Sequence, residues 1–319
     1  MAEAEPRQAI VRLTGVSKAY GTVRAVSGLD LAVPEGAVYG LLGPNGSGKT
    51  TTIRMIMNIL VPDAGRIEIQ NRPADAKSKD AIGYLPEERG LYTKMKVGDL
   101  LHFFAELKGL GKTEATRRVN DWLERVELAE WRDKKINELS KGMQQKIQFI
   151  VSVLGDPPIL ILDEPSSGLD PVNANLLREI LLELRTRGKT ILLSTHRMEE
   201  AERLCDHICL IHRGEKVLDG ELAAIRAAAG KSSARVDYRG DGGVLRTAPG
   251  VVEVDDYGNY AEVRLAPGAD AAALLRYLAG RIDVTGFALQ EPTLNQIFLE
   301  AVGGREAAAP AAAGSREGR

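Results

Sequence analysis

The first part of the chain contains short runs in which apolar residues alternate with polar residues or glycine. Between Ile10 and Val38 the apolar positions are Val11, Leu13, Val23, Leu29, Leu31 and Val33. A period of two is typical of strands that bury one face. We therefore expect a small antiparallel β layer ahead of a short apolar strand at residues 38–42.

From residue 51 onward, helical patterns and apolar strands follow one another. Residues 51–60 carry apolar side chains three or four apart, and Pro62 and Gly65 mark the expected end of this helix. Further strands are expected at 66–70, 81–86, 159–162, 190–194 and 207–211. The entirely apolar run at 159–162 is typical of a strand inside a parallel sheet. Together with a helix after Asp170, these patterns predict an α/β domain.

A purely helical stretch interrupts the strand patterns. One apolar stripe runs through 97–107 and another through 119–126, both at helical spacing. A further helix begins after Ser140, a suitable N-cap residue, and continues to Leu154. We expect these stripes to form the core of a helical subdomain at about residues 88–155.

The pattern changes near residue 227, which predicts a domain boundary between residues 8–226 and 227–303. Strands are expected at 234–238, 251–254, 261–265 and 284–289, and helices at 269–278 and 293–302. Tyr257-Gly258-Asn259 has the composition of a hairpin turn. The second domain is therefore predicted to be a small α/β module. Residues 304–319 are rich in alanine and glycine, and we expect them to be disordered.

Composition narrows the function classes. The 319 residues include 42 Lys and Arg against 44 Asp and Glu, a net charge of −2, so no overall field favours nucleic acid. No apolar run approaches the roughly 18 residues of a membrane span, and the N-terminus lacks a signal-peptide pattern. We expect a cytosolic protein whose membrane role, if it has one, depends on a partner chain.

The only cysteines, Cys205 and Cys209, are too few for a disulfide framework. With His207 and His212 they form one conceivable set of metal ligands. The favoured interpretation places Cys205 at the end of a helix and Cys209 within an apolar strand.

The segment Gly43–Thr51 fits the P-loop pattern G-x-x-x-x-G-K-[ST]. An alternative is a glycine-rich turn with a chance lysine, but the expected strand before it and helix after it favour the P-loop. Lys49 is predicted to reach the β- and γ-phosphates of ATP, and the Thr50 hydroxyl to bind Mg²⁺. The predicted nucleotide-binding residues here are Gly43, Asn45, Gly46, Ser47, Gly48, Lys49, Thr50 and Thr51.

Polar residues follow the later strands where a phosphate could be reached. The apolar strand 159–162 leads into Asp163, predicted to hold Mg²⁺, and Glu164, predicted to orient and polarise the attacking water. His196 lies just past the strand at 190–194 and is a second catalytic candidate. Tyr20, at an apparent turn, is either a surface ring or a platform on which adenine stacks.

Taken together, residues 8–225 resemble the nucleotide-binding subunit of an ATP-binding-cassette (ABC) transporter. The segments that carry the resemblance are Tyr20, Gly43–Thr51, Leu139–Gln144, Ile159–Glu164, Ser167–Asp170 and His196. The resemblance implies a P-loop NTPase fold with a RecA-like core, an antiparallel β subdomain and a helical subdomain. It also implies a head-to-tail dimer around two ATP molecules, in which Ser140 and the Gly142 amide act on the nucleotide of the other subunit. Two further nucleotide-binding residues follow from it, Gln144 and Asp170.

Two departures from the family pattern stand out. The usual L-S-G-G-Q reads L-S-K-G-M, with Lys141 and Met143 as the changed positions. The loop after Tyr84-Leu85-Pro86 normally begins with a glutamine that senses Mg²⁺ and touches the membrane partner, whereas this chain has Glu87. Glu87 is a candidate metal contact, and we expect it to serve mainly in contact with the membrane partner.

The C-terminal module resembles the extension of ABC-2-type exporter subunits, including those similar to sodium and drug exporters, and residues 291–298 share this likeness. The predicted function is therefore an ATPase subunit that drives a separate membrane permease, held at the inner face of the cell membrane by that permease. A soluble ABC ATPase acting on nucleic acid or ribosomes is the alternative. The short helical insertion and the single cassette argue against it.

Overall fold

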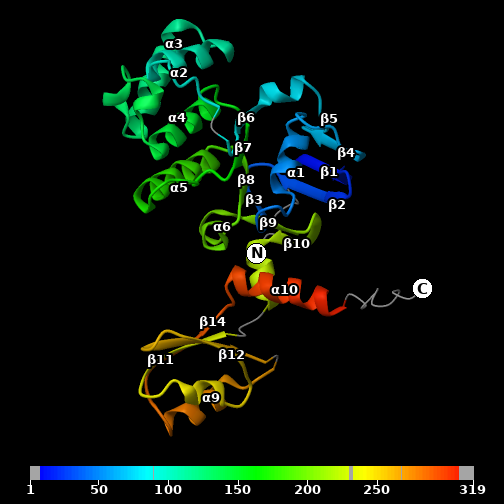
Figure 1. The fold of residues 1–319 in the computed structure, drawn as a ribbon, viewed down its shortest axis with the longest axis vertical. Helices are drawn as coiled ribbons and strands as arrows, with labels where there is room; N and C mark the ends of the chain where they lie inside the picture. The colour runs from blue at the N-terminus through cyan, green and yellow to red at the C-terminus, as the bar shows by residue number, and fades with distance from the viewer. Residues whose placement is uncertain (1–7, 89, 230–232, 267, 309–319) are drawn as a thin grey trace, which may run out of the picture. The chain divides into compact units, whose positions relative to one another are not determined.

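The computed structural model describes residues 8–88, 90–229, 233–266 and 268–308, with side chains as far as residue 303. The chain divides into two compact units, Met1–Gly220 and Glu221–Arg319. The first unit thus ends a few residues before the boundary expected after residue 226. Figure 1 shows the secondary-structure elements of both units.

The first unit is built on a six-stranded sheet in the order β10-β9-β3-β8-β7-β6. Its strands are β3 (Val38–Leu42), β6 (Ile82–Leu85), β7 (Ile159–Asp163), β8 (Thr190–Thr195), β9 (His207–His212) and β10 (Glu215–Glu221). β3 pairs in parallel with β8 and β9, and β7 pairs in parallel with β6 and β8. Every residue of β3, β7 and β8 is buried, as their apolar sequences predict. Because parallel strands end at one edge, the loops after these strands meet there.

The helices that follow these strands are α1 (Lys49–Ile56), α5 (Pro171–Thr186) and α6 (Met198–Leu204). α1 is shorter than the helix predicted at 51–60. Asn58 adopts a left-handed backbone with φ 49°, which is a common way for asparagine to end a helix. The helix therefore stops before Pro62 rather than because of it.

An antiparallel sheet in the order β2-β1-β4-β5 forms the predicted β layer. Its strands are β1 (Ala9–Tyr20), β2 (Val23–Pro34), β4 (Ala64–Ile69) and the short β5 (Arg72–Pro73), with a 3₁₀ turn at Lys77–Ala81 before β6. The alternating apolar residues of β1 and β2, among them Val11, Leu13, Leu29 and Leu31, lie in one core with α1 and the inner strands. This core holds the P-loop between the two sheets.

The helical subdomain consists of α2 (Val97–Leu107), α3 (Lys112–Arg125) and α4 (Lys141–Val153), with 3₁₀ turns at Ala129–Trp131 and Ile136–Glu138. Figure 1 shows these helices as one group, with α4 next to β6. The α3 stripe is buried, and Trp122 packs edge-on against Phe149 of α4 at 6.0 Å. The α2 stripe is buried in its first turns, whereas Leu107 at its end is 65% exposed. That end of the stripe was wrongly expected to be core.

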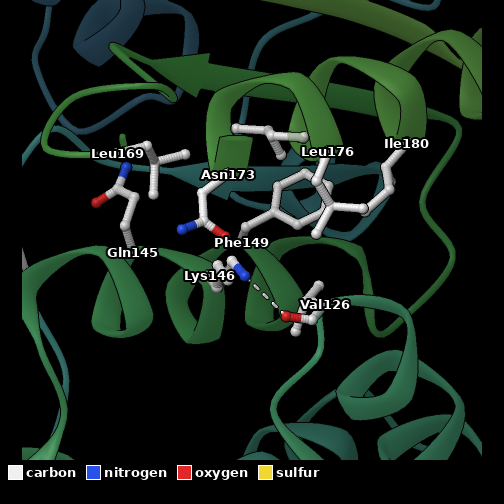
Figure 2. A pocket seen from close by; sticks show the side chains of 9 residues that line it. Val126, Gln145, Lys146, Phe149, Leu169, Asn173, Leu176 and Ile180 are labelled. Atoms are coloured by element: carbon white, nitrogen blue, oxygen red, sulfur yellow. Dashed lines mark hydrogen bonds between the residues drawn. The ribbon is translucent and has the colours of Figure 1, made fainter. Parts of the chain in front are cut away.

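Helix α4 also packs on α5, which ties the helical subdomain to the main sheet. Figure 2 shows Phe149 of α4 facing Leu176 and Ile180 of α5, with Lys146 turned toward Val126. The Lys146 ammonium donates a hydrogen bond of 3.0 Å to the Val126 carbonyl, and burial lowers its pKa. Only about 10 Å³ remains between these side chains, so this crevice is a packing contact and not a ligand site.

The second unit contains α7 (Leu222–Ala229), β11 (Ser233–Arg239), α8 (Gly243–Arg246), β12 (Val251–Asp256), β13 (Tyr260–Leu265), α9 (Ala271–Ala279), β14 (Asp283–Gln290) and α10 (Leu294–Ala308). β12 and β13 form the expected hairpin, and the antiparallel sheet has the order β12-β13-β11-β14. Chain order β-α-β-β-α-β with this strand order is the ferredoxin-like arrangement. Its core joins alternate residues of β11, such as Val236 and Tyr238, to Leu274 and Leu278 of α9.

The expectation of disorder at 304–319 is wrong for residues 304–308, which continue α10. Alanine, arginine and glutamate favour helices strongly enough to extend it past the glycine pair. Residues 309–319 lie outside the described residues. In the described part of the chain, no helix combines the length and the apolar character that crossing a bilayer requires.

Candidate active site

The loop between β3 and α1 is shaped by three glycines with positive φ. Gly43, Gly46 and Gly48 have φ values of 148°, 76° and 110°. A Cβ on Gly43 would lie 2.1 Å from the Ile211 carbonyl oxygen, and one on Gly48 would lie 2.3 Å from the Ala25 carbonyl oxygen. The loop therefore follows the neighbouring backbone closely and leads directly into the N-terminus of α1, where free N–H groups favour an anion.

A polar cavity of about 330 Å³ opens above this loop. Nine residues line it: Ala25, Asn45, Gly46, Gly48, Lys49, Thr50, Thr51, Glu87 and Glu164. The predicted P-loop residues thus meet two of the predicted carboxylates, although these lie far apart in the sequence. Gly43 and Ser47 lie beneath the lining, where Ser47 is buried.

Lys49 is almost fully buried, at 5% exposed. Its ammonium donates hydrogen bonds to the carbonyl oxygens of Gly43, at 2.7 Å, and Pro44, at 3.2 Å, and lies 3.7 Å from Oε1 of Glu164. The charge is therefore held at the cavity floor by its own loop and by a single carboxylate. Because Lys49 lines the cavity, a phosphate that entered it would meet this ammonium.

Asp163 ends β7 and is completely buried. Its Oδ1 accepts hydrogen bonds from the Ser194 hydroxyl and from Thr50 Oγ1, the latter at 3.4 Å, while its Oδ2 is buried with no hydrogen-bond partner among the described residues. Thr50 Oγ1 also lies 3.5 Å from Oε2 of Glu87. Desolvation raises the pKa of Asp163, against the opposing hydrogen bonds from Ser194 and Thr50. Hard oxygen atoms and an unpaired buried carboxylate oxygen are a donor set that fits Mg²⁺.

Glu164 is the next residue and has a left-handed backbone, with φ 50°. Its N–H donates to the Ser194 carbonyl oxygen at 3.2 Å and to the Ser194 hydroxyl at 3.1 Å, which stabilises this unusual turn. The turn directs Asp163 and Glu164 to the same edge of the sheet. His196 Nδ1 lies 3.0 Å from both carboxylate oxygens of Glu164, so the carboxylate stands between His196 and Lys49.

The other predicted residues do not line this cavity. Tyr20 ends β1 and is 51% exposed. Ser140 is the N-cap of α4, accepting a hydrogen bond from the Met143 N–H at 3.3 Å, and the Gln144 amide donates to the Ile136 and Leu139 carbonyls at 3.1 Å. Asp170 caps α5 by accepting from the N–H groups of Val172 and Asn173. Together with Gly142, which lies in the first turn of α4, these residues stay predictions for a site completed by a second chain.

The cysteines have the structural roles that the sequence favoured. Cys205 is the C-cap residue of α6, Cys209 lies in β9, and both are free and buried. Burial raises the pKa of both thiols.

Ser194 is the site residue that the sequence analysis missed. It lies opposite Asp163 in the register of β7 and β8, and bonds both Asp163 and the Glu164 N–H. The available signal was the polar pair Ser194-Thr195 at the end of an otherwise apolar strand. Its meaning depends on which strand lies alongside, which the sequence pattern does not reveal.

Comparison with known proteins places this site in a family. A family model described as "ABC transporter" matches residues 26–167, and one described as "ATP-binding protein DrrA1-3-like, C-terminal domain" matches residues 220–302. The ABC transporter ATP-binding protein YhaQ of Bacillus subtilis is 44% identical over 288 residues, which cover 90% of this chain and 97% of that protein. The chain belongs to the ABC transporter ATP-binding proteins.

Other ABC proteins support this assignment. Nod factor export ATP-binding protein I of Burkholderia orbicola is 41% identical over 64% of this chain and 68% of that protein. A solved ATP-binding subunit of an ABC transporter is 32% identical with a TM-score of 0.65, covering 69% of this chain and 93% of that one. A dimeric post-hydrolysis ATP-binding cassette bound to ADP and Pi is 25% identical with a TM-score of 0.62, covering 66% and 98%. The predicted family, cassette fold and ATPase activity are confirmed.

Proposed function

We propose that this ABC ATPase is the energising subunit of an exporter and that it drives a separate permease by ATP-dependent head-to-tail dimerisation. The observation that carries the catalytic part is the position of Glu164, held between Lys49 and His196 at the rim of the polar cavity. The name of the Nod factor export relative and the match of the C-terminal domain support export.

The proposed chemistry follows from the positions of these side chains. Lys49 and the P-loop amides bind the β- and γ-phosphates of ATP, and Glu164 orients the attacking water and accepts its proton. His196 keeps the Glu164 carboxylate directed into the cavity through Nδ1. Thr50, Asp163 and Glu87 would hold Mg²⁺, which when bound offsets negative charge on the phosphate oxygens.

A second copy of the chain, or a related subunit, would complete the site. Ser140 and Gly142 stand at the N-terminus of the 13-residue helix α4, where free N–H groups and the helix dipole favour a phosphate. Neither residue lines the cavity of its own chain. The dimeric state of the relative bound to ADP and Pi supports this arrangement. We propose that Gln144 and Asp170 support the same interface and that Tyr20 stacks on adenine.

The permease would contact an exposed aromatic cluster that we call the α2 aromatic patch, formed by Tyr92, Phe103 and Phe104. Phe103 lies 5.4 Å from Phe104 and 5.9 Å from Tyr92, measured between ring centroids, and Tyr92 is 55% exposed. Exposed clusters of this kind mark interaction sites. Tyr92 follows Glu87 by five residues, and we propose that the permease contacts both the patch and the Glu87 loop. This proposal places the subunit at the inner face of the membrane.

Affinity purification from detergent-solubilised membranes tests the transport role. The Glu164→Gln variant, loaded with ATP, should retain a polytopic membrane protein, and replacing Tyr92 and Phe103 together by alanine should release it while ATP binding stays intact. Recovery of ribosomes or DNA in place of a membrane protein would contradict export and support the soluble alternative.

A further inference from the structure

Gln148, a side chain of the helical subdomain, is hydrogen-bonded to the loop that carries Glu87. Gln148 of α4 is 4% exposed, and its Nε2 lies 3.1 Å from the Pro86 carbonyl oxygen and 3.1 Å from the Glu88 carbonyl oxygen. The two carbonyls belong to the residues on either side of Glu87. The buried amide of Gln148 therefore holds the backbone on both sides of Glu87, the residue whose carboxylate lies beside Thr50.

The chemistry of this contact fixes its orientation. A carboxamide nitrogen carries two N–H donors, and two carbonyl oxygens are acceptors only. The nitrogen must therefore face the loop, and both of its donors are used. The Gln148 Oε1 is buried without a hydrogen-bond partner in the described part of the chain. The two bonds to the loop are therefore the hydrogen bonds that hold the amide group in place.

In the part of the chain that the structure describes, few other contacts hold this loop. Pro86, Glu87 and Glu88 belong to no helix or strand, and both glutamates are exposed. The Glu88 carboxylate lies 3.7 Å from Arg54, an exposed pair that contributes little. Among the described residues, the Glu87 carboxylate reaches only Thr50 Oγ1, at 3.5 Å. Fixing the peptide groups on both sides of Glu87 thus limits where its carboxylate can stand.

A second amide on the same helix makes a parallel contact. Gln145, one turn earlier and also buried, donates from Nε2 to the Pro165 carbonyl oxygen at 3.2 Å. Pro165 directly follows Glu164. Helix α4 thus contacts both carboxylate-bearing loops of its own chain, and it begins at Ser140, where the second subunit's nucleotide is proposed to bind.

We propose that Gln148 is a positioning residue that sets the place of Glu87 beside Thr50 and Asp163, so that the position of α4 is transmitted to the metal side of the site. This rests on the proposed role of Glu87 as a metal contact. Gln148 does not line the polar cavity, so its proposed effect on the site passes through the loop.

The variant Gln148→Met separates this role from packing. Methionine keeps the length and volume of the side chain, and it removes both the donor and the unpaired oxygen. Ser152→Ala is the matched control, because Ser152 lies one turn later on α4 and is equally buried. Among the described residues, its hydroxyl bonds only the Phe149 carbonyl of its own helix. Both variants should unfold at nearly the temperature of the unmodified chain.

Two measurements on the full chain report the effect. In Gln148→Met, hydrogen exchange at the amides of Leu85, Glu87 and Glu88 should rise, while exchange in α4 stays as in Ser152→Ala. The affinity for a fluorescent ATP analogue should fall about three- to tenfold in Mg²⁺, the size expected from weakened hydrogen bonds, and should be unchanged in EDTA. Equal losses with and without Mg²⁺ would reduce Gln148 to a structural residue and overturn the proposal.

A double-mutant cycle with Glu87→Ala decides whether the effect passes through Glu87. If it does, Gln148→Met should have no further effect on Mg²⁺-dependent affinity once Glu87 is absent. Independent losses in the double variant would overturn the positioning role while leaving Glu87 as a metal contact. If Glu87→Ala alone leaves the Mg²⁺ dependence unchanged, the metal role of Glu87 fails, and the proposal for Gln148 fails with it.

Discussion

Lys49 Nζ lies 3.7 Å from Oε1 of Glu164, so the cation proposed to bind phosphate and the carboxylate proposed to activate water are neighbours before ATP is present. Both side chains are nearly buried, which strengthens their attraction. Phosphate oxygens entering the cavity therefore compete with Glu164 for Lys49. We therefore expect ATP binding to weaken the contact between Lys49 and Glu164.

Replacing Glu164 by glutamine should separate binding from hydrolysis. The amide keeps the shape of the side chain but accepts no proton at neutral pH, so ATP turnover should fall by about 10²–10⁴-fold. ATP affinity should be equal or higher, because Lys49 loses a competing carboxylate. Turnover assays, nucleotide titration and size-exclusion chromatography check this, the last for accumulation of an ATP-bound dimer. Turnover at the wild-type rate would remove Glu164 from the catalytic role.

Replacing Lys49 by alanine should weaken ATP binding itself. The variant loses the ammonium that contacts the Gly43 carbonyl and Glu164 at the cavity. Lys189→Ala is a suitable control, because Lys189 pairs with Asp156 and does not line the cavity. Isothermal titration with ATP should show a large loss for the first variant and none for the second. Equal affinities would contradict the P-loop assignment.

A chain ending at Gly220 should fold and bind ATP. The core of the first unit is complete within residues 9–211, and the C-terminal unit has an apolar core of its own. We expect the truncation to change dimerisation or regulation and to leave ATP affinity within a few-fold of the full chain. Thermal unfolding and nucleotide titration test this. Aggregation of the shortened chain would show that the second unit is required by the main fold.

Glu87→Gln should leave the basal ATPase rate within a few-fold, because glutamine still offers an oxygen at the position beside Thr50. It removes a negative charge that we expect a basic segment of the permease to use. Stimulation of ATPase activity by the reconstituted permease should therefore weaken. A collapse of the basal rate with stimulation preserved would mean that Glu87 acts chiefly at the metal.

Glu114 gives α3 a stability contribution that depends on pH. Hydrogen bonds from Arg117 and then Arg118 lower the pKa of Glu114 from 4.5 to about 2. A lowered pKa means that the contribution is complete above pH 4.5 and is lost as the pH falls toward 2. The stability difference between the unmodified chain and Glu114→Gln should therefore shrink between pH 5 and pH 3. Urea unfolding at several pH values measures it, and a difference that grows on acidification would contradict the assignment.

Local signals made the nucleotide loop predictable, and long-range contacts explain what was missed. Gly43–Thr51 is defined by its own spacing, and the apolar strands β7 and β8 are unambiguous in sequence. The contact of Ser194 with Asp163 depends instead on strand register, and that of Gln148 with Pro86 joins residues 62 apart. Strand β10 was missed because Glu215–Glu221 is mostly polar and half-exposed. Its sequence therefore shows no clear alternation of apolar and polar residues.

The close approach of Gly43 to the Ile211 carbonyl and of Gly48 to the Ala25 carbonyl has a thermodynamic consequence. A loop packed this closely against β9 and β2 loses its conformational entropy when the protein folds. Nucleotide binding should therefore require no further ordering of that segment. Association with ATP is then expected to be fast and insensitive to viscosity-dependent loop closure. We therefore expect nucleotide binding to leave the backbone of residues 43–48 nearly unchanged, so that hydrogen exchange in this segment should differ little between the free and the ATP-bound chain.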